Sequence, residues 1–192
     1  DDVLGLLIAA QDDGGGLSED ELLGNLILLF IAGHETTTNL IGNGALTLLR
    51  HPQQLARLRE RPPLAASAVE EMLRFEGSVN MVARSTTAPY AVGDTLIPAG
   101  ELIFFMLAPA NRDPAVFADP DRFDIGRDPN PHLAFGAGIH FCLGAPLARL
   151  EGEIAFQRLL ARYPALDLPD EPPRWRPWIN LRGLEALTLA AH

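Results

Sequence analysis

The sequence predicts a mainly helical protein with a small antiparallel β part, of the α+β class. Residues 18–50, 64–76 and 146–163 carry apolar side chains at helical spacing. Between 79 and 107 the period changes to short alternating segments that glycine and proline turns separate. Residues 109–131 are too rich in proline and aspartate for regular structure. We therefore expect a helical body with a small sheet packed on it.

Composition restricts the class of protein. The 192 residues are 47% hydrophobic and 21% charged, which is typical of one soluble globular domain. The net charge of −10 argues against a nucleic-acid partner, because no basic stripe is present to displace phosphate counterions. The most apolar run, 22–33, is too short to span a bilayer, so no transmembrane segment is expected. A single cysteine fits a reducing compartment and predicts a cytoplasmic protein.

The first helices are predicted from their boundaries. A helical run over 2–11 ends in an Asp- and Gly-rich loop over 12–16. Ser18 then caps the next helix, and Glu21 completes a capping box. Apolar residues lie nearly all round the helix over 18–50, so we expect it to be buried on most of its faces.

The middle of this long helix is its weakest part. Gly33 and the threonines at 36–38 are poor helix formers, and threonine hydroxyls compete for backbone carbonyls. An opened turn would form a small groove beside an acid and an alcohol, Glu35 and Thr36. The alternative is a glycine for close helix packing beside a capping-type threonine cluster. His34 has no partner histidine at helical spacing, and we interpret it as structural or pocket-lining.

The next elements are a helix and three short strands. A short helix over 52–59 begins after His51, and residues Glu71 and Arg74 share one face of the following helix. Their side chains can form a bidentate pair. Strands are predicted over 79–86, 90–96 and 101–107.

One cysteine stands in a glycine-rich stretch: Phe135-Gly136-Ala137-Gly138-Ile139-His140-Phe141-Cys142-Leu143-Gly144. Because Cys142 is the only cysteine, it has no intrachain disulfide partner. Gly136, Gly138 and Gly144 would let the backbone fold tightly and approach a flat ligand. The helix that follows places the sulfur at a helix N-terminus, where a thiolate is favoured. Two interpretations remain: an inert core cysteine, or a thiolate that ligates a metal.

The pattern Phe-Gly-x-Gly-x-His-x-Cys-x-Gly resembles the haem-binding loop of the cytochrome P450 family. The stretch Ala32-Gly33-His34-Glu35-Thr36 is similar to the oxygen-binding element of that family's distal helix. Glu71-x-x-Arg74 stands between these two elements, in the family's order. The resemblance implies the C-terminal portion of the P450 fold, with a meander over 109–131, a cysteine loop over 132–144 and a C-terminal β region over 174–190.

The resemblance also implies roles for single residues. The cofactor would be haem b, with Cys142 as axial ligand of the iron. Glu35 would feed protons inward, and Thr36 would donate a hydrogen bond to the oxygen bound at the iron. The other cofactor-binding residues would be Ala32, Gly33, Arg84, Phe135, Gly136 and His140, with Arg84 and His140 facing the haem propionates. The substrate pocket would include Leu28, Ile31, Ala32, Asn80, Val82 and Ile179.

Three of these assignments have alternatives. Arg84 could be an ordinary exposed strand arginine, and Trp178, beside Ile179, could be a core aromatic residue. Either Arg122 or Arg127 could join Glu71 and Arg74 in the structural network that the family carries.

The activity that the resemblance implies is that of a haem-thiolate monooxygenase of the soluble bacterial type. It would use dioxygen to hydroxylate or otherwise oxidise a small, largely apolar organic substrate, with electrons from a donor such as a ferredoxin and its reductase. The alternatives are a noncatalytic haem-binding or sensor module, a peroxide-driven haem enzyme and an inactive fragment. Family members carry a further helical half before the first helix seen here. We therefore expect the N-terminal half to be absent, and the chain alone to bind haem weakly or to self-associate.

Overall fold

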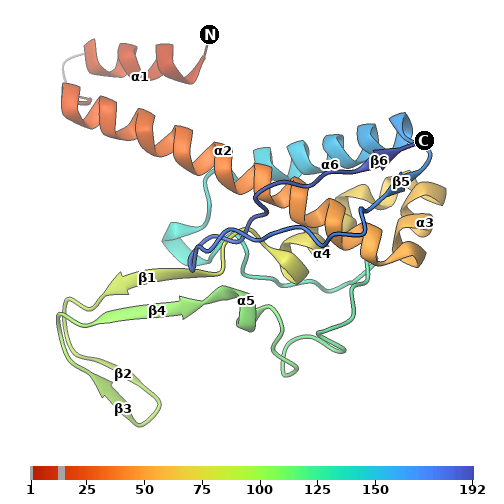
Figure 1. Cartoon of the computed structure of the whole chain (residues 1–192). Coiled ribbons are helices and arrows are strands. Elements are labelled where there is room, and N and C mark those ends of the chain that lie inside the picture. Colours follow the sequence, from red (N-terminus) through yellow and green to blue (C-terminus); the bar gives the residue numbers. More distant parts are fainter. Residues whose placement is uncertain (1, 13–15) are drawn as a thin grey trace. The chain divides into compact units, whose positions relative to one another are not determined.

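The computed structural model describes residues 2–12 and 16–192, so positions 13–15 of the expected glycine loop lie outside it. Its helices and small antiparallel sheets confirm the mainly α class with a small β part (Figure 1). The chain divides into two units, Asp1–Thr36 and Thr37–His192. Within the described residues no helix has the length and apolarity that a membrane crossing requires.

The first unit contains α1 (Val3–Asp12) and the first part of α2 (Glu19–Arg50). The capping box is present: the Ser18 amide donates to Glu21 Oε2 at 2.9 Å, and the Glu21 amide donates to Ser18 Oγ at 3.3 Å. Burial on most faces is wrong for this part of α2. Leu22 and Leu26 are half-buried. Six other large apolar side chains are at least 40% exposed, because α1, the other helix described in this unit, does not cover them; they are Leu23, Ile27, Leu28, Leu29, Phe30 and Ile31.

The core of the second unit lies between the C-terminal part of α2, α4 (Ala65–Glu76) and α6 (Ala145–Arg162). Glycines set how closely these helices approach. A Cβ on Gly44 would lie 2.7 Å from both Met72 Sδ and Phe156 Cζ, and a Cβ on Gly152 would lie 3.2 Å from Val69. Both positions therefore need glycine for packing rather than for backbone conformation.

Short helices link the core elements. α3 (Pro52–Glu60) begins directly after His51, and the 3₁₀ turn η1 (Pro62–Leu64) leads into α4. α5 (Leu107–Ala110) follows the sheet region, and η2 (Gly138–His140) lies within the cysteine loop. The meander expected over 109–131 begins two residues later, because 109 and 110 belong to α5; residues 111–131 contain no helix or strand.

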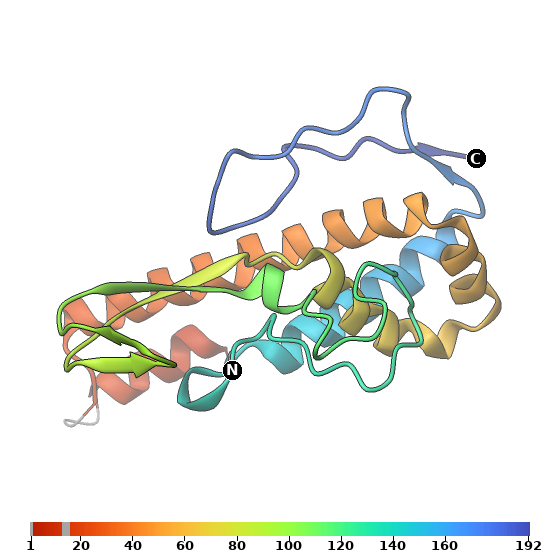
Figure 2. The ribbon, with the colours of Figure 1, turned by 90° about the horizontal axis from the view of Figure 1, so that it is seen from below.

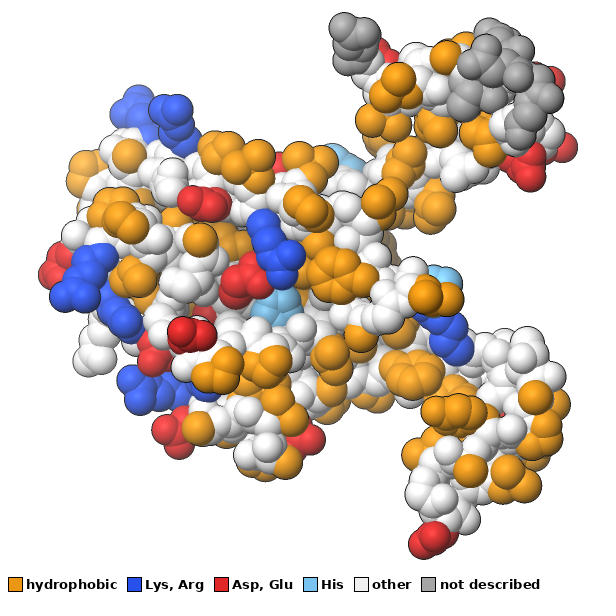
Figure 3. All heavy atoms as spheres, turned by 180° about the vertical axis from the view of Figure 1, so that it is seen from behind, with side chains coloured by type: hydrophobic (Ala, Val, Ile, Leu, Met, Phe, Trp, Pro, Cys, Tyr) orange, Lys and Arg blue, Asp and Glu red, His pale blue; other side chains and the backbone are white. Residues whose placement is uncertain are grey.

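The β region contains two separate two-stranded sheets. β1 (Met81–Ser85) pairs antiparallel with β4 (Leu102–Met106), with Arg84 opposite Ile103. The segment expected as one strand over 90–96 is two strands, because the turn expected at Gly93-Asp94 divides it: β2 (Tyr90–Val92) and β3 (Thr95–Ile97) form a hairpin. The chain reverses at Gly93, whose φ of +56° lies in the left-handed region that favours glycine. Hydrophobic side chains gather on the surface of this hairpin (Figure 3).

The C-terminal region is less regular than its sequence pattern indicates. β5 (Leu166–Asp167) pairs with β6 (Ala190–Ala191), but residues 174–189, which precede β6, form only the isolated bridges Val79–Leu181 and Trp175–Leu184. Three prolines between 172 and 177 remove amide donors that a strand ladder requires. Asn43 of α2 donates to the carbonyl of Arg182 at 2.9 Å and so holds this extended segment beside α2 (Figure 2).

Candidate functional site

The cysteine loop, residues 132–144, joins the irregular segment to α6. Two glycines allow its tight turns, since Gly136 and Gly138 have φ values of +71° and +66°. The Cys142 amide donates to the carbonyl of Phe135 at 2.9 Å, and the Phe141 amide donates to that of Gly138 at 3.0 Å. The loop is therefore a closed, hydrogen-bonded turn that presents Cys142.

Cys142 is exposed, so the interpretation as an inert core cysteine is wrong. The residue lies just before α6, whose N-cap is Gly144, and its carbonyl accepts the Ala145 amide at 3.2 Å. Gly144 differs from the other two glycines, because its φ is −81° and no left-handed turn requires it. A Cβ added there would have only Cys142 Sγ as a close neighbour, at 3.9 Å, so this glycine leaves space beside the sulfur.

The residues next to Cys142 in the loop carry exposed apolar side chains. Ile139, Phe141 and Leu143 are 99%, 50% and 89% exposed. The ring of Phe141 packs edge-on against that of Phe135, with centroids 6.2 Å apart. A soft thiol donor on an apolar, glycine-rich surface fits the axial side of a flat apolar macrocycle such as haem.

The two side chains expected at the propionates, Arg84 and His140, are both exposed. Arg84 lies on β1, and its guanidinium donates only to the carbonyl of the neighbouring Ala83, at 2.7 Å. His140 ends the η2 turn, two residues before Cys142. Both side chains are accessible to a carboxylate of a ligand. For Arg84 the exposure is equally compatible with an ordinary surface arginine.

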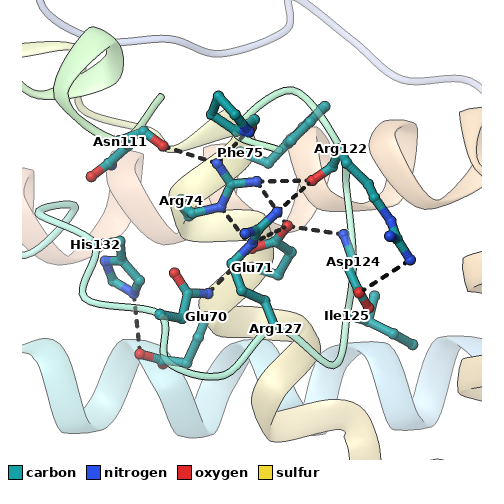
Figure 4. Close-up of polar contacts among 12 residues, drawn as sticks. Glu70, Glu71, Arg74, Phe75, Asn111, Arg122, Asp124, Ile125, Arg127 and His132 are labelled. Atoms are coloured by element: carbon teal, nitrogen blue, oxygen red, sulfur yellow. Dashed lines mark hydrogen bonds and ion pairs between the residues drawn. The ribbon is translucent and has the colours of Figure 1, made fainter. Parts of the chain in front are cut away.

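Glu71 and Arg74 form a fully buried pair in which neither side chain is exposed (Figure 4). Arg74 Nε and Nη2 donate to the two Glu71 oxygens, both at 2.8 Å. The remaining donors of Arg74 reach three backbone carbonyls at 2.8–3.1 Å, those of Asn111, Pro120 and Arg122. All five N–H donors of the guanidinium therefore have acceptors.

The guanidinium that joins this pair is that of Arg127. Its Nε lies 3.2 Å and 3.3 Å from the two Glu71 oxygens. Arg122 contributes its backbone carbonyl instead, while its guanidinium is 63% exposed and reaches Asp124 at 3.5 Å. Helical spacing could not separate the two arginines, because both lie in a segment without regular structure.

A second ionic network, absent from the sequence analysis, lies next to the first. Arg149 of α6 donates to both oxygens of Glu70, at 2.7 and 2.9 Å, and His132 Nε2 lies 3.1 Å from Glu70 Oε2. The only sequence signal was a second glutamate beside Glu71. Neighbouring helix residues point about 100° apart, so Glu70 must have other partners than Glu71. The sequence does not show which residues those partners are.

The α2 segment expected to open is continuous helix from residue 32 to residue 38. The Thr36 hydroxyl does bond back to a carbonyl, that of Ala32, at 2.7 Å, and this local bond is compatible with an unbroken helix. Glu35 and Thr36 are half-buried, whereas Leu28, Ile31, Ala32 and Gly33 are exposed. The ring of His34 stacks on that of Phe30, with centroids 5.9 Å apart.

The pocket residues expected from the second unit lie near one another at the start of β1. Asn80 exchanges backbone contacts with Asn180 and α5, and its side-chain amide lies 3.4 Å from the carbonyl of Ile179. Val82 is half-buried, and Ile179 is 75% exposed. Trp178 is 45% exposed, so the interpretation as a core aromatic residue is wrong.

Comparison with known proteins identifies the family. The sequence model described as cytochrome P450 matches residues 1–178. The chain belongs to the cytochrome P450 family. Cytochrome P450 107B1 of Saccharopolyspora erythraea is 53% identical over 190 residues, which are 97% of this chain and 47% of that protein. The monooxygenase PikC of Streptomyces venezuelae is 51% identical over 193 residues, 98% of this chain and 46% of that protein.

Solved P450 structures share the fold. The tirandamycin C-bound P450 monooxygenase TamI matches with a TM-score of 0.96 and 46% identity, over all of this chain and 49% of that one. P450BioI, solved in complex with a fatty-acid-ligated acyl carrier protein, matches with a TM-score of 0.91 and 46% identity, over 98% of this chain and 52% of that one. The chain thus spans about half the length of the curated P450 relatives it matches.

Proposed function

We propose that this chain forms part of a haem-thiolate monooxygenase that oxidises a small, largely apolar organic substrate with dioxygen. The observation that carries the proposal is the exposed Cys142 on a hydrogen-bonded, glycine-turned loop in a chain of the P450 family. A buried thiol in the same sequence pattern would not support it.

In this proposal the cofactor would be haem b, and the sulfur of Cys142 would bind its iron. Haem, when bound, supplies oxygen activation, and a thiolate ligand favours cleavage of the O–O bond. The exposed Arg84 guanidinium would bind a propionate through charge-assisted hydrogen bonds, and the exposed His140 ring would donate a hydrogen bond to a propionate. Phe135 and Gly136 would form the apolar, closely approaching part of the loop on the cysteine side.

In this proposal Thr36 would donate a hydrogen bond at the reaction site and Glu35 would supply protons to it. The hydroxyl of Thr36 has one hydrogen, and in this structure it goes to the carbonyl of Ala32 at 2.7 Å. To donate elsewhere, the hydroxyl must rotate away from that carbonyl. The half-buried carboxyl of Glu35 stands beside it in the chain and would resupply the proton.

The substrate, electron donor and location are parts of the same proposal. Exposed Leu28 and Ile31 on α2, with Val82 and Ile179, support an apolar substrate. Relatives named for biotin and polyketide biosynthesis support a biosynthetic intermediate of that kind. A ferredoxin with its reductase would supply electrons, and the single cysteine supports a cytoplasmic location.

The deciding experiment adds carbon monoxide to the reduced, haem-reconstituted chain. A red-shifted, thiolate-type Soret band that is lost in Cys142→Ser supports the proposal, and the same spectrum in both proteins refutes it. Thr36→Ala, compared with the wild type in the longest form of the protein, then separates the alternatives. In a monooxygenase the substitution will leave electrons consumed without matching product, whereas a sensor module will form no product with or without the substitution.

A further inference from the structure

Two neighbouring carboxylates on α4 serve different parts of the molecule. Glu71 binds the irregular segment through Arg127 and the amide of Asp124. Glu70 points to the other side and contacts His132 and Arg149. His132 is the first residue of the cysteine loop, and Arg149 lies in the second turn of α6, just after the loop ends. Glu70 therefore joins the two ends of the loop.

The geometry at the start of the loop fixes the imidazole of His132. Its side chain is 3% exposed. Nδ1 accepts the amide hydrogen of Ala134 at 3.2 Å, so in the neutral ring the hydrogen is on Nε2, which faces Glu70 Oε2 at 3.1 Å (Figure 4). One side chain thus ties the loop backbone to α4.

The geometry at the end of the loop fixes the guanidinium of Arg149. Its two hydrogen bonds to Glu70 form a bidentate pair, which holds the planar group in one orientation. The same guanidinium lies over the ring of Phe135, 4.7 Å from its centroid. Phe135 in turn accepts the amide hydrogen of Cys142 through its carbonyl, at 2.9 Å. Contacts therefore run without a gap from Glu70 to the backbone of Cys142.

We propose that Glu70 is a positioning residue for Cys142: it clamps both ends of the cysteine loop through His132 and Arg149 and so fixes where the sulfur lies. The part of this inference that concerns haem rests on the proposed function, whereas the clamp itself concerns only residues of this chain.

The charge state of Glu70 supports the clamp. Burial alone would raise the pKa of the Glu70 carboxyl, but the hydrogen bond from His132 and the hydrogen bonds and charge of Arg149 outweigh it and lower the pKa to about 2. The carboxylate therefore stays charged at neutral pH and keeps both partners. Of the three side chains Arg149 is the most exposed, at 40%, whereas His132 is almost completely buried. The contact between Glu70 and His132 is therefore the better shielded of the two from water.

The first test is amide hydrogen exchange of the full 192-residue chain. Glu70→Gln keeps the shape of the side chain and removes its charge. The matched control is Glu153→Gln on α6, where Glu153 accepts a hydrogen bond from Gln157 at 3.3 Å. Glu70→Gln is expected to speed exchange of the Ala134, Phe141 and Cys142 amides about tenfold, because these amides exchange by local opening of the loop. The control is expected to leave them unchanged. Unchanged loop exchange in Glu70→Gln, or an equal rise throughout α4 and α6, would overturn the proposal.

A second variant keeps the test valid if Glu70→Gln does not fold. Arg149→Lys keeps the charge but loses the bidentate fork and the planar stacking on Phe135. It is expected to loosen the same amides to a smaller extent, and protection equal to the wild type would count against the clamp.

The spectrum of the carbon monoxide complex separates this inference from the proposed function. In the haem-reconstituted chain, Glu70→Gln is expected to lower the fraction of thiolate-type Soret absorption, while Glu153→Gln matches the wild type. A fraction equal to the wild type, despite faster loop exchange, would overturn the role of the clamp in placing the sulfur. If the wild type itself lacks the band, the proposed function fails, and the exchange result alone decides whether Glu70 clamps the loop.

Discussion

Replacing Glu71 by glutamine should strongly destabilise the second unit. The Glu71 side chain is fully buried and accepts two hydrogen bonds from Arg74 at 2.8 Å, a contact from Arg127 at 3.2 Å and the Asp124 amide at 2.9 Å. An amide has no charge and offers one acceptor oxygen, so the buried Arg74 cation loses its counter-ion and one acceptor. Removing one partner of a buried ion pair costs about 3–5 kcal/mol.

That loss is a large share of the stability of an ordinary domain, about 5–15 kcal/mol. For 150–250 residues each kcal/mol lowers Tm by about 2–4 °C, so Glu71→Gln should lower it by about 6–20 °C.

Urea denaturation followed by far-ultraviolet circular dichroism, with calorimetry for Tm, measures this loss. The control is Glu153→Gln, which makes the same chemical change at a half-buried glutamate of α6 whose hydrogen bond from Gln157 is exposed, and it should stay within about 0.5 kcal/mol of the wild type. A loss below about 1 kcal/mol for Glu71→Gln would refute the reasoning, because it would mean that the Arg74 cation needs no buried counter-ion.

Three further predictions use matched comparisons. Arg127→Leu should cost about 1–3 kcal/mol in urea denaturation, and Arg122→Leu less than about 0.5, because only the first guanidinium reaches Glu71; equal losses would contradict this. Glu70 has a pKa of about 2 in the fold against its ordinary 4.5, so its contribution to the free energy of unfolding is complete above about pH 4.5 and disappears as the pH falls toward 2. After allowance for solvent screening, the Glu70 contribution to the free energy of unfolding is about 1–2 kcal/mol. In urea denaturation the wild type should lose this amount between about pH 4.5 and 2, and Glu70→Gln should not. Gly44→Ala should lower Tm, at a cost of about 1–3 kcal/mol, because the new Cβ would lie 2.7 Å from Met72 and Phe156. Gly42→Ala should raise Tm, because a Cβ there has no neighbour within 4 Å and alanine favours the helix. A lower Tm for Gly42→Ala than for Gly44→Ala would contradict this packing.

The sequence predicted the helices well because their signals are local. Ser18 with Glu21 marks the start of α2, and His51 before Pro52 marks its end and the start of α3. The spacing of Glu71 and Arg74 also predicted their pairing. The pattern around Cys142 placed that residue on a glycine-turned loop before a helix, which is where it lies.

Burial and long-range contacts were not predictable from local pattern. The first part of α2 is apolar all round, yet it is exposed, because burial depends on which other elements cover a helix. Arg127 and Arg122 both lie in irregular chain, and only the tertiary path decides which one reaches Glu71. The alternation over 174–190 indicated strands, but prolines and missing neighbours leave only two bridges there.

The central claim is that the sulfur of Cys142 is bonded to a haem iron. X-ray absorption at the iron edge of the haem-reconstituted chain measures this bond directly. The account predicts one sulfur atom among the nearest neighbours of the iron in the wild type, and none in Cys142→Ser. A wild-type spectrum with only nitrogen and oxygen neighbours would contradict it.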